Sequence, residues 1–370
     1  MKKKLTIAAV GDLAPLRKLT DCASQVNEVF EVLRQADLSI ANLELPLTTS
    51  EFEADKAITL KAHPCIAPSL LDGGVNVVNI ANNHAVDFGV EGLFESIEVV
   101  EASGVAVVGG GKDLEAAAKP AIIEIDGLRV AILGFCSALP TGYAAGPTRP
   151  GIAPIRAHAR FFIDNITLDE QPGMSPWVET TVNLNDQEFA CKQISSAKAD
   201  ADLVIVNMHW GIPNGWCASF QGPLADYQQP LAHSLIDAGA DIILGHHPHV
   251  IHGIEKYKDG LIAYSLGNFL FHSMGDDKKT ELTVVIYPPY KVDSLLTGEA
   301  REAIIIELDI DEKKMTEVRF LPIHMNAKGD PEFLDEEDSK RVLKRLEQHS
   351  LEFGLKIPTE KGIGKIQLNN

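Results

Sequence analysis

The feature that most constrains this chain is a repeated pattern, in which short apolar runs typical of buried strands are each followed directly by polar side chains. The runs alternate with stretches of helical periodicity, and this alternation predicts an α/β sandwich. Ligands bind at the carboxyl ends of the strands in open α/β sheets, so we expect the polar side chains to meet there. These side chains are Asp12; Asn42 and Glu44; Asn82, Asn83, His84 and Asp87; His209; and His246, His247 and His249.

The most concentrated motif is LGHHPHVIHGIE at residues 244–255, which carries four of the twelve histidines of the chain. Neutral imidazole is the commonest metal-binding side chain, and two histidines separated by one residue point to the same side of an extended backbone. Taken alone, the motif could also be a surface turn whose histidines only form hydrogen bonds. Together, the carboxylates, an amide oxygen and the imidazoles form a mixed ligand set that suits Mn²⁺, Fe or Zn²⁺.

The formal net charge of −19 excludes some classes of partner. A nucleic acid or an anionic membrane would need a broad basic face, which this charge argues against. An anionic substrate would need a local positive centre, which a bound metal ion would provide. The five cysteines are scattered and form no CxxC motif, so we expect reduced thiols in a reducing compartment.

The N-terminal region predicts a first strand at residues 5–10. Its apolar stretch is too short for the core of a secretory signal, which needs about 7–15 apolar residues. No other apolar stretch approaches the roughly 20 residues of a membrane helix. We therefore expect a cytoplasmic protein without an integral membrane segment.

The length of 370 residues allows one large domain or two smaller ones. We expect a single α/β domain over residues 1–330 and a C-terminal extension over residues 331–370, with one helix and then a loose end. Residues 121–136 predict a β-hairpin across an Asp-Gly turn. Two stretches break the periodic pattern, near 138–180 and 273–300, and they predict insertions or lid loops.

The order of the motifs GD, NLE, ANNHAVDFG, HWG, GHHPHVIHGIE and YSLGNFLF resembles the CapA family, named for capsule and poly-γ-glutamate synthesis proteins. The resemblance covers residues 5–272. That family is similar in fold to the calcineurin-like metallophosphoesterases. The resemblance therefore implies a four-layer α/β/β/α sandwich with metal ions at one edge.

The resemblance also implies two divalent metal ions, with Glu44 as the carboxylate that bridges them. Ala14 stands where metallophosphoesterases carry the histidine of a DxH motif, so one of the two ions is expected to bind weakly. His84 is implied as the residue that protonates the leaving group, with Asp87 holding its ring. The implied metal ligands are Asp12, Glu44, Asn83, His209, His247 and His249.

Four further residues are candidates for contacting the substrate: Asn42, His246, His252 and Asn268. For the two histidines the alternative is an ordinary hydrogen-bonded role, and for Asn268 it is capping of a turn. The stretch 138–180 also carries side chains that could receive an anionic substrate, or that belong to a solvated loop. They are Tyr143, Arg149, Arg156 and Arg160.

The predicted function is a metal-dependent hydrolase that cleaves a phosphoester or an amide bond with a metal-activated water. Two alternatives remain open at this point. One is a role in capsule or poly-γ-glutamate biosynthesis or assembly, and the other is a non-catalytic binding module with the same metal site. The expected partner is a small-molecule or oligomeric anionic substrate and not a nucleic acid. The sequence does not indicate an oligomeric state.

Overall fold

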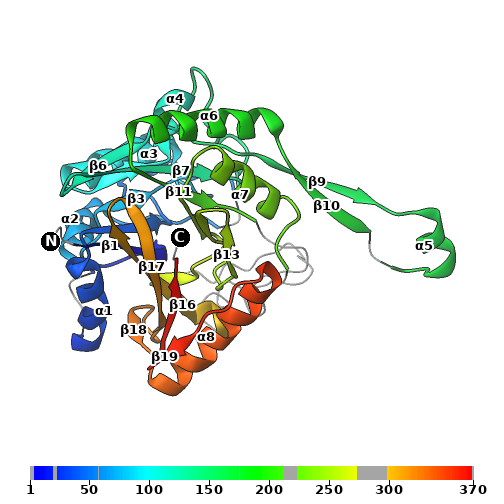
Figure 1. The fold of residues 1–370 in the computed structure, drawn as a ribbon. Helices are drawn as coiled ribbons and strands as arrows, with labels where there is room; N and C mark the ends of the chain where they lie inside the picture. Colours follow the sequence, from blue (N-terminus) through cyan, green and yellow to red (C-terminus); the bar gives the residue numbers. More distant parts are fainter. Residues whose placement is uncertain are drawn as a thin grey trace.

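The computed structural model describes residues 4–19, 23–56, 58–174, 176–211, 223–272 and 298–368. Within them, two large sheets pack face to face (Figure 1). In spatial order the larger sheet contains β19 (Thr359–Glu360), β20 (Ile363–Gln367), β17 (Lys314–Met325), β16 (Glu302–Asp311), β1 (Leu5–Ala14), β2 (Leu38–Leu43), β3 (Val77–Asn79) and β4 (Ala106–Val108). Two more strands join it, β15 (Asn268–Phe271) beside β1 and β18 (Pro331–Phe333) beside β17.

The smaller sheet has six strands, and its central pairings are parallel. Their spatial order is β13 (Ile254–Tyr257), β14 (Gly260–Ala263), β12 (Ile242–His246), β11 (Leu203–His209), β7 (Leu128–Cys136) and β6 (Ala121–Ile125). The hairpin expected at residues 121–136 is confirmed as β6 and β7. Asp126 and Gly127 form its turn with φ values of 47° and 82°, as a two-residue turn between twisted strands requires.

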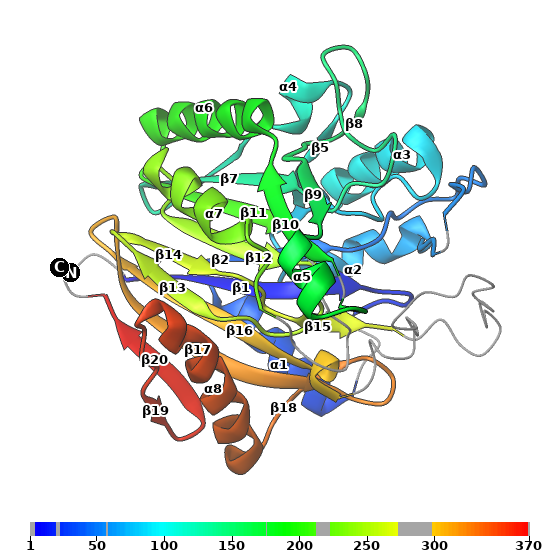
Figure 2. The ribbon, with the colours of Figure 1, turned by 90° about the vertical axis from the view of Figure 1, so that its right-hand side faces the viewer.

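Helices cover the outer faces of both sheets, which produces four layers (Figures 1 and 2). The larger sheet is covered by α1 (Ser24–Gln35), α2 (Ala67–Asp72) and α3 (Gly89–Ala102). The smaller sheet is covered by α6 (Leu184–Asp200) and α7 (Gln228–Asp237). A short helix, α4 (Leu114–Ala117), packs beside the two-residue strands β5 (Gly110–Gly111) and β8 (Gly151–Ile152).

Alternation along the strands explains this layering, because successive side chains of a strand point to opposite faces. In β1, Ile7 and Ala9 belong to the core between the sheets, whereas Ala8 and Val10 belong to the core under the outer helices. The expected four-layer α/β/β/α sandwich is thus confirmed. Within the described residues, none of the helices combines the length and the apolar character that crossing a membrane would require.

The C-terminal residues are more ordered than expected. The predicted helix is α8 (Glu336–Ser350), whose Leu343 and Leu346 belong to the core between the sheets. The loose end expected after it is wrong, since β20 pairs with β17 and buries Ile366. The apolar alternation of so short a segment does not by itself predict a strand. The segment forms one because β17 offers an edge with which it can pair. The division of the chain near residue 330 stays a prediction.

The stretch predicted as an insertion at 138–180 contains an arm that leaves the body of the molecule (Figure 1). The arm consists of β9 (Ala157–Phe162), α5 (Asn165–Glu170) and β10 (Trp177–Val182). The second predicted insertion, at 273–300, lies outside the described residues up to residue 297.

A close approach of two backbones fixes the geometry at the carboxyl end of β1. Strand β15 runs parallel to β1 and places Asn268 beside Asp12. The Asp12 N–H donates to the Gly267 carbonyl at 3.0 Å. A Cβ atom on Gly11 would lie 1.9 Å from the same carbonyl oxygen, so only glycine allows this approach.

Candidate metal centre

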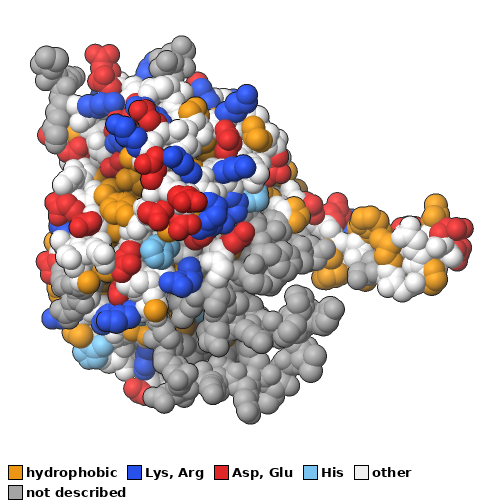
Figure 3. Space-filling model, turned by 90° about the horizontal axis from the view of Figure 1, so that it is seen from below, with side chains coloured by type: hydrophobic (Ala, Val, Ile, Leu, Met, Phe, Trp, Pro, Cys, Tyr) orange, Lys and Arg blue, Asp and Glu red, His pale blue; other side chains and the backbone are white. Residues whose placement is uncertain are grey.

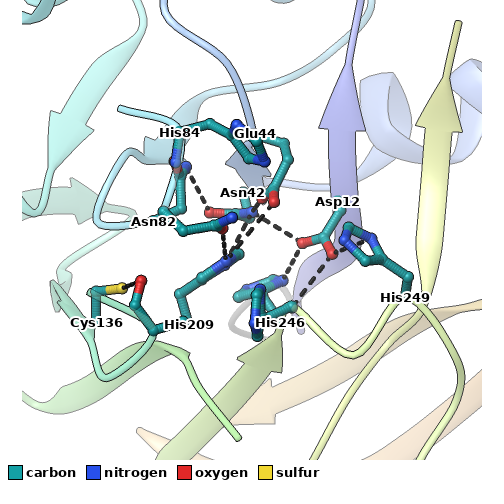
Figure 4. Close-up of polar contacts among 12 residues, drawn as sticks. Asp12, Asn42, Glu44, Asn82, His84, Cys136, His209, His246 and His249 are labelled. Atoms are coloured by element: carbon teal, nitrogen blue, oxygen red, sulfur yellow. Dashed lines mark hydrogen bonds and ion pairs between the residues drawn. The ribbon is translucent and has the colours of Figure 1, made fainter. Parts of the chain in front are cut away.

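Two rows of polar side chains meet at one end of the core between the sheets (Figure 4). In the larger sheet, Asp12 is paired with Asn42, and Asn42 with Asn79, at the carboxyl ends of β1, β2 and β3. In the smaller sheet, His209 and His246 are paired at the ends of β11 and β12. All five side chains are at most 1% exposed. The expected convergence of the strand-end motifs is therefore present in the structure.

Glu44, His209 and His247 form a first group whose ligand atoms lie within 4.8 Å of one another. His209 Nε2 lies 3.6 Å from Glu44 Oε1 and 2.8 Å from the side-chain oxygen of Asn83. The rings of His209 and His247 have their centroids 4.6 Å apart. One carboxylate, one amide oxygen and two imidazoles thus face a common point.

Asp12, Glu44 and His249 form a second group, also within 4.8 Å, so Glu44 belongs to both groups. The side-chain amide of Asn42 donates to Asp12 Oδ1 at 2.8 Å and also to Glu44 Oε2, which spaces the two carboxylates. His249 Nδ1 lies 3.3 Å from Asp12 Oδ2. Ala14 is buried and adds no donor, so this group has fewer protein donors than the first.

Three observations indicate that the donor atoms fit divalent metal ions. Glu44 Oε1 and His247 Nδ1 are buried without a hydrogen-bond partner, and such atoms are rare unless something else satisfies them. Burial, and next the charge of Asp12, raise the pKa of Glu44 well above its usual value, which a nearby cation would reverse. Burial also lowers the pKa of His247 to about 3 and, with the neighbouring histidines, that of His209 well below its usual value. Neutral imidazole is the form that binds metals.

The backbone of the HPH segment is held in an unusual conformation to present its rings. His247 and His249 have φ values of 97° and 59°, which non-glycine residues adopt at a cost of about 1–3 kcal/mol each. The His247 N–H donates to Asp12 Oδ2 at 3.2 Å, which ties this turn to the other sheet. This conformation turns both rings toward the site. Sequence spacing alone predicted only that the two rings lie on the same side of the backbone.

Beside the metal groups, His84 contacts a buried carboxylate. His84 Nδ1 lies 2.6 Å from Asp87 Oδ2, and Asp87 is fully buried. Burial lowers the pKa of His84, an effect that Asp87 opposes and that the nearby ammonium of Lys56 reinforces. The hydrogen bond orients the ring and leaves Nε2 as its second functional atom.

Asp87 has three further partners, two of which are side chains that sequence reasoning did not connect with it. Lys56 Nζ donates to Asp87 Oδ1 at 2.6 Å and to the Asn83 carbonyl at 2.6 Å. The Tyr143 hydroxyl donates to Asp87 Oδ1 at 2.9 Å, and the Leu60 N–H donates to Oδ2 at 2.7 Å. Lys56 and Tyr143 lie in loops without periodicity, so no local signal links either of them to Asp87.

Asn79 and Asn207 were also missed. The Asn79 side chain donates to the Asn42 oxygen at 2.9 Å, and the Asn207 oxygen lies 3.4 Å from His246 Nε2. Both interrupt apolar strands, which was an available signal because a buried amide needs partners.

The four residues expected to contact substrate are all buried. Asn42 contacts the carboxylates, His246 Nδ1 lies 3.4 Å from Asp12 Oδ1, and the Asn268 oxygen lies 2.7 Å from His249 Nδ1. His252 is the one that lies outside the two ligand groups. Its backbone N–H donates to the Ser265 carbonyl, and its ring lies near His349. A substrate contact by any of the four stays a prediction.

The arginines of the 138–180 stretch are engaged within the chain. Arg156 forms two hydrogen bonds of 2.6 Å with Asp186 through its Nε and Nη2 atoms. Arg149 donates to the Ala144 carbonyl, and Arg160 lies 3.5 Å from Glu179. Reception of an anionic substrate by these arginines stays a prediction.

Several known proteins are similar to this chain in sequence. The model of the family described as "Bacterial capsule synthesis protein PGA_cap" matches residues 6–273. The capsule biosynthesis protein CapA of Bacillus anthracis is 32% identical over 73% of this chain and 60% of its own length. The PGA biosynthesis protein CapA of Bacillus subtilis is 32% identical over 72% of this chain and 63% of its own length. The chain thus spans less than two thirds of the length of these relatives. A solved structure of a hypothetical protein from Thermus thermophilus has a TM-score of 0.48 and 16% identity, covering 86% of this chain and 98% of that one.

Proposed function

The chain belongs to the bacterial capsule synthesis protein family PGA_cap, and from that premise we propose that it is a metal-dependent hydrolase of a phosphoester or amide bond. The observation that carries the proposal is the position of Glu44. It is the one carboxylate that belongs to both ligand groups, and one of its oxygens is buried without a hydrogen-bond partner among the described residues. A bridging carboxylate of this kind is what a two-metal hydrolytic site requires.

Two divalent ions of Mn, Fe or Zn, when bound, would supply a water of lowered pKa and positive charge for an anionic transition state. Glu44, Asn83, His209 and His247 would hold one of them, and Asp12, Glu44 and His249 the other. The second set has fewer protein donors, so we expect it to bind its ion more weakly. Asn42 keeps the two carboxylates at a fixed separation by donating to both.

His84 would act on the leaving group. Its Nδ1 is held by Asp87, so the ring presents Nε2 in a fixed direction. Proton transfer from a positioned imidazole to a departing oxygen or nitrogen typically contributes about 10²–10⁴-fold to the rate. Lys56 and Tyr143 hold Asp87 and thereby the orientation of His84.

The metal part of the proposal is tested by elemental analysis of purified protein after incubation with Mn²⁺ or Zn²⁺. We expect bound metal in the wild type and a loss of about one equivalent in His247→Ala. His252→Ala is the matched control, because this histidine is also buried in the same segment but lies outside both groups. Equal metal content in the two variants would remove His247 from the ligand set.

The catalytic part is tested with the metal-loaded protein on phosphoesters and γ-glutamyl amides. His84→Ala should keep its metal and lose more rate on alkyl phosphates or amides than on nitrophenyl phosphate, whose leaving group departs without a proton. Equal losses on all substrates would remove His84 as the general acid. Full metal content without turnover of any ester or amide would favour a binding module with the same site.

A second candidate function rests on the relatives. Two proteins of 32% identity are named for capsule or PGA biosynthesis, so a role for this chain in the synthesis or assembly of an anionic polymer is the alternative. Binding of poly-γ-glutamate to the metal-loaded protein, without any shortening of the polymer, would favour that role. We also propose a cytoplasmic location. The distribution of the full chain among the fractions of broken cells tests it.

A further inference from the structure

The imidazole of His249 is oriented by a side chain that belongs to neither ligand group. His249 Nδ1 lies 2.7 Å from the side-chain oxygen of Asn268 and 3.3 Å from Asp12 Oδ2. Asn268 is completely buried, and the pairing of β15 with β1 places it beside Asp12. Asn268 is therefore close to both residues that, with Glu44, form the second ligand group.

The orientation of the Asn268 amide follows from its other partners. Its nitrogen donates to the Ala300 carbonyl at 3.0 Å and to the His249 carbonyl at 3.4 Å. Carbonyl oxygens only accept hydrogen bonds, so the NH₂ group must face them and the amide oxygen must face the imidazole. An amide oxygen also only accepts. The short contact with His249 Nδ1 is thus a hydrogen bond in which the ring nitrogen donates.

This hydrogen bond selects one form of the His249 ring. In neutral imidazole one nitrogen carries the proton and the other accepts with its lone pair. With the proton on Nδ1, Nε2 is the nitrogen that is able to bind a metal ion. Metal-binding histidines typically donate their other N–H to an oxygen in this way, which fixes the tautomer and the direction of the ring. Phe271, also on β15, packs perpendicular to the same ring with the centroids 5.8 Å apart.

The carbonyl group to which this amide donates is itself fixed by the C-terminal part of the chain. Ala300 lies in the short helix η4 (Gly298–Arg301) and is completely buried. Arg345 of α8 lies 3.5 Å from Glu299 and donates to Glu302 at 2.5 Å, so it bonds on both sides of Ala300. Charged side chains of both signs are interspersed on the face of the molecule that carries α8 (Figure 3). These contacts connect α8 to the metal centre.

We propose that Asn268 is a positioning residue for the second metal ion. It holds His249 with the proton on Nδ1, so that Nε2 is the nitrogen available to the ion. The inference rests on the proposed function, because it concerns one of the two ions of that site. It also gives a role to η4 and α8, which lie beyond residues 6–273, the part of the chain that the family model matches.

The tautomer of His249 tests this proposal directly in metal-free protein. Nitrogen-15 NMR of protein labelled at histidine distinguishes the two ring nitrogens, and His249→Gln identifies the signals of this ring. The wild type should carry the proton on Nδ1. Asn268→Ala should lose this preference, whereas Asn268→Asp should keep it because a carboxylate accepts from the same N–H.

Metal binding gives the second readout. Calorimetric titration with Mn²⁺ measures separate dissociation constants for the two ions. Asn268→Ala should raise the constant of the weaker ion by about 10–100-fold, the usual effect of removing such a partner, and Asn268→Asp should restore binding. The constant of the tighter ion should not change. Asn76→Ala is the matched control, because the Asn76 oxygen accepts from the Ser39 N–H at the amino end of β3, and it should change neither constant.

Three results would overturn the proposal. One is a wild-type His249 with its proton on Nε2. Another is Asn268→Ala that folds by circular dichroism and keeps the wild-type tautomer and both dissociation constants. The third is equal weakening of both ions in Asn268→Ala without rescue in Asn268→Asp, which would assign Asn268 to packing. Absence of metal from the wild type would contradict the proposed function, while the tautomer would still decide what Asn268 does to the ring.

Discussion

At the residue scale, the contact with the widest consequence joins Lys56 to Asp87. The carboxylate is completely buried, and the ammonium is 2.6 Å from it with 19% of the lysine side chain exposed. The same ammonium holds the carbonyl of Asn83. One side chain thus connects a proposed metal ligand to the carboxylate that orients His84. Removing one member of a buried ion pair is costly because the other charge stays desolvated.

Lys56→Met should therefore lower the free energy of unfolding by roughly 3 kcal/mol. Urea denaturation at pH 7 measures the change. Lys61→Met is the matched control, because Lys61 lies in the same loop and contacts the Ser50 carbonyl, the exposed Glu51 and the ring of Phe88, but no buried carboxylate. The free energy of unfolding of Lys61→Met should fall by no more than about 1 kcal/mol, as for most partly exposed positions. Similar losses in both variants would show that Lys56 has no special relation to Asp87.

At the element scale, the hairpin of β16 and β17 carries a charge network across the larger sheet. Arg319 Nη1 lies 2.7 Å from Asp309 Oδ2, and Arg319 Nε lies 3.0 Å from Glu307. Lys4 of the N-terminal segment reaches the same Asp309 at 2.7 Å. The network joins the outer hairpin to the start of β1, since β16 is the direct neighbour of β1.

This network predicts a dependence of stability on pH. Burial raises the pKa of Asp309, but the hydrogen bonds and charges of Arg319 and Lys4 outweigh it, so the net pKa is lowered. A carboxyl whose pKa is lower in the folded state adds stability that is complete above its unfolded pKa of about 3.9, and that is lost as the pH falls through the folded value.

Arg319→Met should thus cost roughly 1–3 kcal/mol at pH 7, the usual range for hydrogen bonds to charged groups. The difference from the wild type should shrink as the pH falls below about 4. Chemical denaturation of both proteins between pH 3 and pH 7 measures it. A difference that is constant over this range would assign the loss to packing by the Arg319 side chain.

At the scale of the whole molecule, the proposed site joins both sheets. Asp12 and Glu44 come from the larger sheet, and His209 and His247 come from the smaller sheet and the loop that follows it. An ion bound to both would connect the two inner layers, and a ligand that binds only the native state stabilises it by mass action.

Mn²⁺ or Zn²⁺ should therefore raise the melting temperature of the metal-free protein. At a free concentration 100 times the dissociation constant, the gain is about 2.7 kcal/mol per site. Differential scanning calorimetry with and without a chelator measures the shift, and His247→Ala should reduce it. The same shift in His247→Ala, with unchanged metal dependence, would mean that the stabilising ion binds elsewhere.

Much of this architecture was predictable from local patterns. The apolar periodicities predicted the α/β sandwich, and the Asp-Gly turn predicted the hairpin of β6 and β7. Polar residues at the ends of buried strands predicted that Asp12, Glu44 and His209 would converge, because carboxyl ends of parallel strands lie at one edge. These signals are local, since they depend on the period of the backbone and on residues adjacent in the chain.

Tertiary structure alone decided the rest. Lys56 and Tyr143 both contact Asp87, although they lie 31 and 56 residues from it in the sequence. No periodicity links positions so far apart. Whether Arg156 meets a substrate or Asp186 depends on which partner the fold brings within reach. The C-terminal strand β20 exists because β17 presents a free edge. Which residues of the arm share a face depends on strand register, which becomes visible only when β9 and β10 are paired.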